Sequence, residues 1–502
     1  MGSELTVASS SFLALAIGLA LSFEFVNGFH DTANAVATVI YTNSLKPIVA
    51  VIWSGIWNLI GVLTSTGLVA FSVVALLPAE LVLNVGSGAG FAMVFALLIS
   101  AILWNLGTWY LGLPASSSHT LIGSILGVGV ANAWLGESFG EGVNWAKTEE
   151  VLIALLTSPL IGFCCAALLL LIGKFLLPQP ELFAAPDEEK PPPLWIRGLL
   201  ILTCTGVSFA HGSNDGQKGM GLIMLILVGI LPGLYALNLT LTPDAVNQLT
   251  SSAQTIVNQL EQIEQDYLYE INYLPVDNSQ IATNEQATNE LSRFLKTSAD
   301  ISEITLIALA VKEKEITEML AGASLTELST PQRSQLRSDV YLISSTLEKL
   351  ERLHQLPVAL DTDIVQTHRC QLASLTQFIP IWVKVAVAIA LGIGTMVGWK
   401  RIVVTVGERI GKEHLTYAQG ASAELVAMGT IIAADQLGLP VSTTHVLSSG
   451  VAGTMTANGS GLQITTVRNI LLAWVLTLPV CIGLGGATFA AGLAVVHLLG
   501  FE

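Results

Sequence analysis

The sequence predicts an all-α polytopic membrane protein of about 10 to 12 membrane segments, built as two inverted-topology repeats with discontinuous helices and interrupted by a soluble helical insert. Three observations support this prediction. The chain is unusually apolar, two short polar motifs occur twice in the same order, and one acidic stretch differs in composition from everything around it.

The composition indicates a membrane protein. Of the 502 residues 52% are apolar and only 12% are charged, about half the charged fraction of a soluble globular protein, and the mean hydropathy is +0.66. Nucleic-acid binding is disfavoured as a function, because the net charge is −16 and no basic stripe is present. The five cysteines show no metal-ligand spacing, so no resident metal is expected.

Apolar stretches long enough to cross a hydrocarbon core of about 30 Å recur along the chain. They cover 48–70, 92–111, 151–173, 380–398 and 470–500. The first apolar run has no Lys or Arg before it and leads directly into polar residues, so we expect it to be a membrane helix and not a cleaved signal.

Residues 238–378 predict a soluble helical insert. They contain 19 acidic and 9 basic residues, a net charge of −10, and apolar residues at helical spacing predict helices over 246–266, 286–321 and 331–356. We therefore divide the chain into a first membrane repeat (1–175), a cytoplasmic linker (176–196), the start of the second repeat (197–237), the acidic insert on the periplasmic side (238–378) and the remainder of the second repeat (379–502).

The duplication is carried by two pairs of motifs. FVNGFHDTANA at 25–35 matches FAHGSNDGQKG at 209–219, and GLPASSSHT at 112–120 matches GLPVSTTHV at 438–446. Gly28 and Pro114 are 86 residues apart and Gly212 and Pro440 are 228 apart, and the difference of 142 is about the length of the insert. Removing the insert brings the two halves into register.

The basic residues predict that the repeats cross the membrane in opposite senses. Lys and Arg gather at 174–197 and at 400–412, which the positive-inside rule places in the cytoplasm, whereas none precedes Lys46. Inverted repeats of this kind place a substrate site near the midplane, where the halves meet.

Asp31 and Asp215 occupy equivalent positions in the two copies. A charge at membrane depth costs about 3 to more than 10 kcal/mol, so both are expected to face a cavity, an ion or a partner. A position at the membrane interface is the alternative. Gly28 and Gly212, flanked by polar residues, predict that each helix is broken there.

The hydroxyl runs predict an anion site. Ser116, Ser117 and Ser118 in one half, and Ser442, Thr443 and Thr444 in the other, follow Gly-Leu-Pro, and proline favours the first turn of a helix. Free N–H groups at a helix N-terminus attract anions, so two such termini could hold a tetrahedral oxyanion with neutral donors. Hydroxyls that merely cap their own helices are the alternative. His119 and His445, also paired by the repeat, either relay protons or orient the hydroxyls.

These four motifs resemble those of the inorganic phosphate transporter (PiT) family, and most closely those of bacterial low-affinity phosphate transporters of the inner membrane. The resemblance covers both membrane halves, and the insert carries no motif. It implies phosphate uptake, often as a neutral metal–phosphate complex, driven by protons or sodium, with the phosphate held between the two hydroxyl runs. It nominates Asp31, Asn34, Asp215 and Asn214 as further substrate or ion ligands, and His211, Glu424 and Asn105 as coupling residues.

One departure from the family pattern concerns the coupling ion. Asparagine follows the first aspartate as Asn34, but Lys218 stands at the equivalent place in the second copy. An ammonium there would fill the position of a cation, so proton coupling is preferred over sodium, and His30 supplies a group that titrates near neutral pH. A salt bridge to Asp215 that only offsets charge is the alternative.

The sequence therefore predicts a proton-coupled phosphate symporter without a cofactor, with a divalent metal as a possible co-substrate and arsenate as a competitor. Sodium coupling, a membrane-embedded phosphohydrolase and a passive anion channel remain as alternatives. The oligomeric state is left open, with a homodimer as one option.

Overall fold

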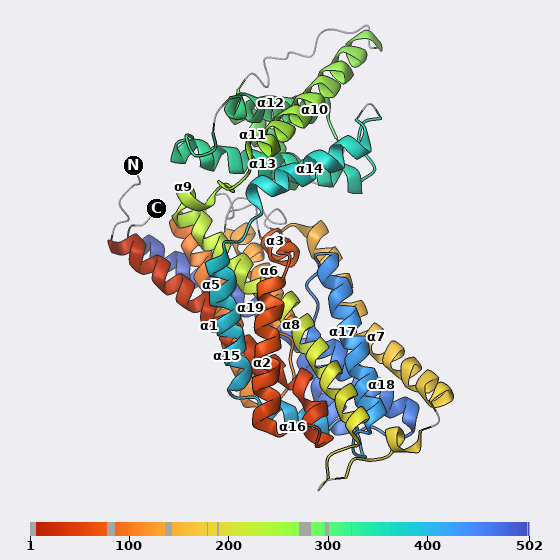
Figure 1. Cartoon of the computed structure of the whole chain (residues 1–502). Helices are drawn as coiled ribbons and strands as arrows, with labels where there is room; N and C mark the ends of the chain where they lie inside the picture. The colour runs from red at the N-terminus through yellow and green to blue at the C-terminus, as the bar shows by residue number, and fades with distance from the viewer. Residues whose placement is uncertain are drawn as a thin grey trace. The chain divides into compact units, whose positions relative to one another are not determined.

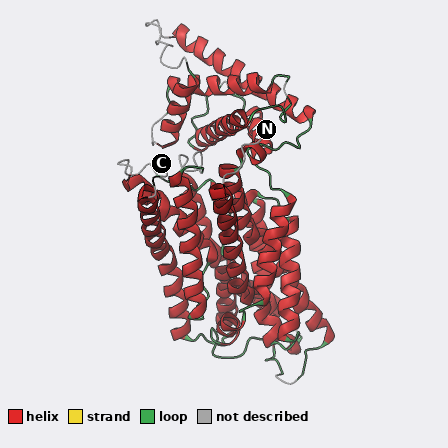
Figure 2. Ribbon diagram, turned by 90° about the vertical axis from the view of Figure 1, so that its left-hand side faces the viewer, coloured by secondary structure: helices red, strands yellow, loops and turns green. Residues whose placement is uncertain are grey.

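The computed structural model describes residues 7–77, 86–135, 143–177, 179–187, 190–270, 283–296, 301–322, 324–358, 360–498 and 500, although the side chains of 7–9, 32–34, 146, 264–270 and 296 fall outside the description. These residues form helices and loops and no strand (Figure 2). The chain separates into two compact units. We call Leu5–Ile226 with Ile379–Glu502 the membrane unit, and Leu227–Phe378 the insert unit.

The helices of the membrane unit follow in chain order in Figure 1. They are α1 (Val7–Tyr41), α2 (Pro47–Thr64), α3 (Leu68–Val74), α5 (Gly88–Tyr110), α6 (Ser117–Leu135), α7 (Trp145–Leu176), η1 (Pro180–Phe183), α8 (Leu194–Ile230, whose last turn is in the insert unit), α15 (Ile381–Met396), α16 (Lys400–Glu408), α17 (Tyr417–Gln436), α18 (Thr443–Asn458) and α19 (Ile464–Leu498).

Six helices of the described chain are long and apolar enough to cross a membrane. The number is seven if the helix Thr362–Thr376 and α15, which are bent at the break between them, count together as one span; we call them the bent pair. The six include most of 48–70, 92–111 and 470–500 and all of 151–173, which the sequence singled out, whereas 380–398 corresponds to the bent pair. The hydroxyl helices α6 and α18 are not among them, since α18 has only 16 residues and both begin with polar side chains. The expected total of 10 to 12 crossings stays a prediction.

Large apolar side chains are exposed along the helices of the membrane unit, and several charged side chains are buried within it. Leu156, Leu160 and Val475 are each at least 66% exposed, whereas Asp215 and Lys218 are fully buried. An exposed apolar surface around buried charges is favoured in a hydrocarbon solvent, because lipid satisfies neither charges nor backbone groups.

The helices that carry the aspartates are continuous, so the predicted breaks at Gly28 and Gly212 are wrong. Helix α1 runs through Gly28 and α8 runs through Gly212. The glycines instead permit close helix contact. A Cβ on Gly28 would lie 2.4 Å from the Leu391 carbonyl oxygen of α15, and one on Gly212 would lie 2.2 Å from the Asn58 carbonyl oxygen of α2. Small residues of this kind let membrane helices approach backbone to backbone.

The chain does break at the two Gly-Leu-Pro motifs. Helix α5 ends at Tyr110 and α6 begins at Ser117, while α17 ends at Gln436 and α18 begins at Thr443. Gly112 and Gly438 have φ values of +67° and +66°, which only glycine adopts without strain. The two connections are thus built alike, and each delivers its hydroxyl run to the start of a new helix.

The packing of α6 and α18 follows the duplication. Helix α6 packs along α19, and α18 packs along α7, so the hydroxyl helix of each half contacts the long helix that follows its counterpart in the other half. Both long helices contain a proline, Pro159 in α7 and Pro479 in α19. This exchange joins the two halves into one core, whereas their inverted orientation in the membrane stays a prediction.

The insert unit consists mainly of helices. These are α9 (Pro232–Tyr235), α10 (Pro243–Glu270), α11 (Asn284–Lys296), α12 (Glu303–Leu320), α13 (Thr330–Arg352) and α14 (Thr362–Thr376). The single helix expected over 286–321 is wrong: it divides into α11 and α12, because Ser302 caps α12 by accepting a hydrogen bond from the Thr305 N–H. Helix α14 was not expected. Leucines and isoleucines of α10 to α14 form a separate apolar core, which explains the helical periodicity of this region.

Candidate functional site

Asp31 of α1 lies where the two hydroxyl helices meet. Thr444 of α18 donates a hydrogen bond to Asp31 Oδ1. Ser117 of α6 lies 2.9 Å from Asp31 Oδ2 and 3.3 Å from Asp215 Oδ2. A serine has one hydroxyl proton, so Ser117 can serve one of the two carboxylates at a time. All four side chains are buried.

Asp215 of α8 is paired with a cation from its own helix. Lys218 Nζ lies 2.8 Å from Asp215 Oδ1 and donates a 2.5 Å hydrogen bond to Ser118 Oγ. Ser118 in turn donates to the Val441 carbonyl at 2.6 Å, which links α6 to the loop before α18. This cluster of Asp31, Asp215 and Lys218 carries a charge of −1 when all three are ionised and the neighbouring histidines and Glu24 are neutral.

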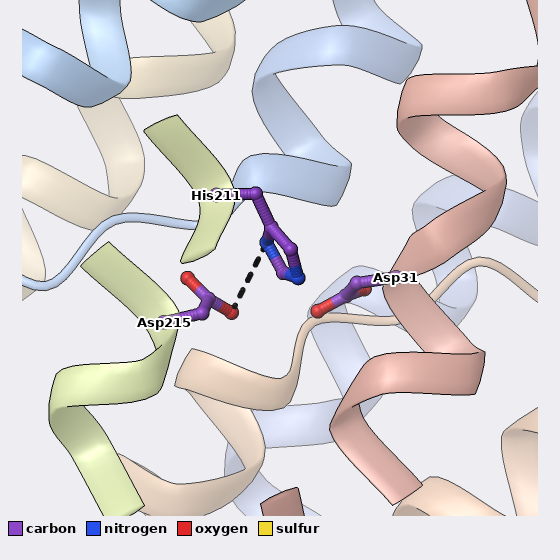
Figure 3. Close-up of side chains that lie close together, drawn as sticks. All are labelled: Asp31, His211 and Asp215. Atoms are coloured by element: carbon purple, nitrogen blue, oxygen red, sulfur yellow. Dashed lines mark ion pairs between the residues drawn. The ribbon is translucent and has the colours of Figure 1, made fainter. Parts of the chain in front are cut away.

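His211 extends between the two carboxylates (Figure 3). Its Nδ1 lies 3.7 Å from Asp215 Oδ2, and among the described residues neither ring nitrogen has a hydrogen-bond partner. One ligand atom each from Asp31, His211 and Asp215 lie within 4.8 Å of one another, a spacing that a metal ion could bridge. The sequence nominated all three residues for the site, and no resident metal was expected from it, but it did not show that their ligand atoms lie close together, because the residues come from two distant segments.

The hydroxyls of the two runs have different partners. Ser116 accepts a hydrogen bond from the His119 N–H, and Ser442 accepts one from the His445 N–H, both at 3.1 Å. The first hydroxyl of each run therefore caps its own helix. Within the described structure the Thr443 hydroxyl is buried without a hydrogen-bond partner.

The two motif histidines lie against each other. The rings of His119 and His445 have centroids 4.5 Å apart, and His445 stacks on Trp474 at 4.0 Å. His119 Nδ1 is 2.9 Å from Ser116 Oγ. Trp474 donates to the Pro114 carbonyl at 2.9 Å, so one indole holds both the ring stack and the first motif loop.

The remaining nominated residues are spread around this centre. His30 lies 3.4 Å from Asp31 Oδ1 and 3.2 Å from the Thr108 hydroxyl. Asn214 donates to the Leu439 carbonyl at 3.2 Å, beside the second motif loop. The side chain of Asn34 lies outside the described residues.

Within the described structure, neither Glu424 nor Asn105 has a hydrogen bond to Asp31 or Asp215. Glu424 of α17 accepts a hydrogen bond from Thr203 of α8. Asn105 of α5 is fully buried, and both of its amide atoms lack hydrogen-bond partners in the described structure.

Two buried acids were missed by the sequence analysis. Glu24 is fully buried one helical turn before Asn27, and its Cγ occupies the space where a Cβ on Gly219 would lie. Asp435 of α17 accepts hydrogen bonds from Ser213 at 2.7 Å and Gln217 at 2.5 Å. An isolated acid in an apolar run was the available signal for Glu24.

The fold and this site define a multi-pass membrane transport protein, with helices of membrane length around a buried, charged and hydroxyl-rich centre. Residues 27–485 match the model of the phosphate transporter family, and the chain belongs to this family. It is thus a phosphate transporter, as the motifs indicated, and its multi-pass architecture agrees with the expected place in the bacterial inner membrane.

Individual relatives match over nearly their whole length. The chain is 40% identical to the low-affinity inorganic phosphate transporter PitB of Escherichia coli K12, covering 98% of this chain and 99% of PitB. It is 41% identical to PitA of the same strain, covering 95% and 96%, and 41% identical to the transporter of Buchnera aphidicola from Acyrthosiphon pisum, covering 94% of each.

A solved structure titled "The sodium-dependent phosphate transporter" has a similar fold. Its TM-score is 0.50 at 17% identity, covering 96% of this chain and 98% of the other. The matched relatives are named as transporters, so the chain is not an enzyme, and the hydrolase alternative is set aside.

Proposed function

We propose that this protein imports inorganic phosphate by symport with protons, and that phosphate binds between the N-termini of α6 and α18. The observation that supports this most directly is the convergence of hydroxyls from both helices, Ser117 and Thr444, on the Asp31 carboxylate. Donors that reach an aspartate oxygen can also reach a phosphate oxygen placed beside it.

Binding would then exchange hydrogen-bond partners. When Asp31 gains a proton or a cation, its oxygens need fewer hydroxyl donors, so Ser117 and Thr444 become available to the phosphate. The Thr443 hydroxyl, buried without a hydrogen-bond partner in the described structure, adds a further donor. The free N–H groups at the N-termini of α6 and α18 would add a favourable electrostatic interaction with the phosphate. Neutral donors bind a phosphate without the strength of an arginine clamp, which suits a carrier that must release its substrate.

The cargo we favour is a neutral complex of a divalent metal with hydrogen phosphate. The charge of the cluster is −1 in that ionisation state, so a bare phosphate anion would be repelled. A divalent cation cancels the charge of HPO4²⁻, and Asp31, His211 and Asp215 offer it two carboxylates and one imidazole. This ligand set is compatible with several divalent metals, since carboxylate suits harder ions and imidazole suits softer ones.

Proton coupling is supported by Lys218. Its ammonium lies 2.8 Å from Asp215, where a sodium ion would otherwise bind a carboxylate. His30, close to Asp31, is the group we assign to proton exchange while His211 is a ligand of the metal, and His211 can take that part only when no metal is bound; His119 and His445 orient the hydroxyl runs. Sodium coupling is the second candidate, because the solved structure of similar fold is titled sodium-dependent.

The test is uptake of radiolabelled phosphate into proteoliposomes containing the full chain, under an imposed proton or sodium gradient, each with and without a divalent metal. The proposal expects accumulation on the proton gradient alone and stimulation by the metal. Accumulation that requires sodium would overturn proton coupling. Accumulation that is insensitive to metal and to chelator would overturn the metal–phosphate cargo while leaving phosphate transport intact.

A further inference from the structure

A second cavity lies outside the transport site, at the end of the membrane unit that carries the basic loops. It has a volume of about 650 Å³ and is formed by the last turn of α5, the loop that follows it, and α16 with the residues on either side of it. Helix α16 lies at the lower end of the unit in Figure 1. None of the residues assigned to phosphate transport lines this cavity.

The charged residues that line the cavity are all cations. They are Lys400, Arg401 and Arg409. The neighbouring acid, Glu408, hydrogen-bonds Tyr41 and is not part of the lining. The positive charge of the cavity is therefore not neutralised by an acid within its own wall, and its complement is an anion.

Aromatic side chains form the rest of the wall. Trp109, Tyr110 and Trp399 line the cavity, and the guanidinium of Arg401 lies 5.1 Å from the Trp109 ring centroid and 4.9 Å from that of Tyr110. Tyr110 and Leu111 are 66% and 69% exposed. Tryptophan and tyrosine are characteristic of the membrane–water boundary, where an apolar ring adjoins a polar headgroup layer.

The wall is fixed by hydrogen bonds between the two halves of the chain. Trp109 Nε1 donates to the Gly398 carbonyl at 2.8 Å, the Thr405 hydroxyl donates to the Gly112 carbonyl at 2.9 Å, and Arg401 donates to the Tyr110 carbonyl at 2.6 Å. A guanidinium has five N–H donors. In the described structure Arg401 donates one hydrogen bond, and its other N–H groups remain available to a ligand.

We propose that this cavity binds the phosphate group of an anionic phospholipid from the cytoplasmic leaflet. The positive-inside rule assigns this end of the membrane unit to the cytoplasm, and basic pockets between membrane helices on that side recognise acidic headgroups. The exposed aromatic and apolar wall suits the glycerol and upper acyl chains of a lipid, which a free phosphate ion lacks. Since Gly112 opens the loop to Ser116, a bound headgroup would brace the connection that positions the first hydroxyl run.

The experiment is native mass spectrometry of the purified full chain, equilibrated with mixed phosphatidylglycerol and phosphatidylcholine. We expect retention of phosphatidylglycerol over phosphatidylcholine. Each cation near a membrane surface contributes a factor of about five to anionic lipid binding, so Lys400→Gln with Arg401→Gln should lower this preference roughly 25-fold. Arg401→Lys keeps the charge and should retain most of it.

The matched control is Lys174→Gln. Lys174 is also a cation over an aromatic ring, 6.0 Å from the Phe183 centroid, in the other basic segment. Because this control removes one cation, a loss of about fivefold, equal per charge to that of the double variant, would overturn the proposal in favour of diffuse surface charge. Release of the lipid by inorganic phosphate, but not by sulfate at equal ionic strength, would also overturn it, because the cavity would then be a free-phosphate site. The readout is lipid retention, so it does not depend on phosphate uptake.

Discussion

Replacing Lys218 by asparagine tests the coupling ion directly. The substitution restores, in the second copy of the motif, the residue that the first copy has at Asn34. It removes an ammonium 2.8 Å from Asp215 and 2.5 Å from Ser118, at a position with no solvent exposure. Asp215 is then left as a buried carboxylate without its cation.

The expected loss of stability in Lys218→Asn is large. Removing one partner of a buried ion pair destabilises a protein by about 3–5 kcal/mol. A sodium ion bound in the vacated position would recover part of this free energy, by about 2.7 kcal/mol at a concentration 100 times its dissociation constant. We therefore expect Lys218→Asn to unfold at a lower temperature than the wild type in potassium, and to regain much of the difference in sodium.

Two measurements check this expectation. Thermal unfolding is followed in sodium and potassium at equal ionic strength, and phosphate uptake is followed under a sodium or a proton gradient. The matched control is Lys384→Asn, since Lys384 donates to the Ser65 carbonyl and lies in the same unit. A Lys218→Asn protein with unchanged stability in both salts and full proton-driven uptake would refute the assignment of the ammonium as a built-in cation.

Three further predictions concern the aspartates, the anion and the insert. Asp31→Asn and Asp215→Asn should each abolish uptake while the protein still enters the membrane fraction, and normal uptake by either would remove the paired-aspartate argument. Arsenate, which is tetrahedral and similarly charged, should compete with phosphate, and unchanged uptake in excess arsenate would count against the site. Lys312→Met should destabilise the insert unit by about 3–5 kcal/mol, because it leaves Asp339, 2.7 Å away and fully buried, without its cation. Burial already raises the pKa of Asp339, so the folded state binds the proton more tightly than the unfolded state, and the loss measured by thermal unfolding should be smaller at pH 5 than at pH 7.

The membrane helices and the pairing of motifs could be predicted because their signals are local. Length and hydropathy are properties of a continuous stretch, and a repeated motif implies that equivalent residues are placed alike. The capping of α6 and α18 by Ser116 and Ser442 follows from the same local rules.

The predictions from the sequence were wrong where the role of a residue depends on a partner that is distant in the chain. A glycine followed by polar residues can break a helix or allow another helix to approach, and only the backbone atoms of α15 and α2, within 2.4 Å of a Cβ at Gly28 or Gly212, distinguish the two cases. Likewise, the sequence could not show that Ser117 faces two carboxylates while Thr443 has no hydrogen-bond partner in the described structure.

The unequal partners of the two aspartates bear on how a carrier of this kind can be driven. Asp215 is paired with an ammonium, whereas Asp31 accepts from neutral hydroxyls, so Asp31 is the carboxylate that can gain or lose a cation without breaking an ion pair with a lysine. A bare monovalent phosphate about 4 Å from a site of net charge −1 would be repelled by about 4 kcal/mol at an effective dielectric constant of 20, which lowers its occupancy about a thousandfold. A phosphate that arrives with a proton, or as a metal complex, leaves the charge of the site unchanged. On the proposed function, symport would follow from electrostatics, because the buried cluster would admit the anion only together with a charge that neutralises it.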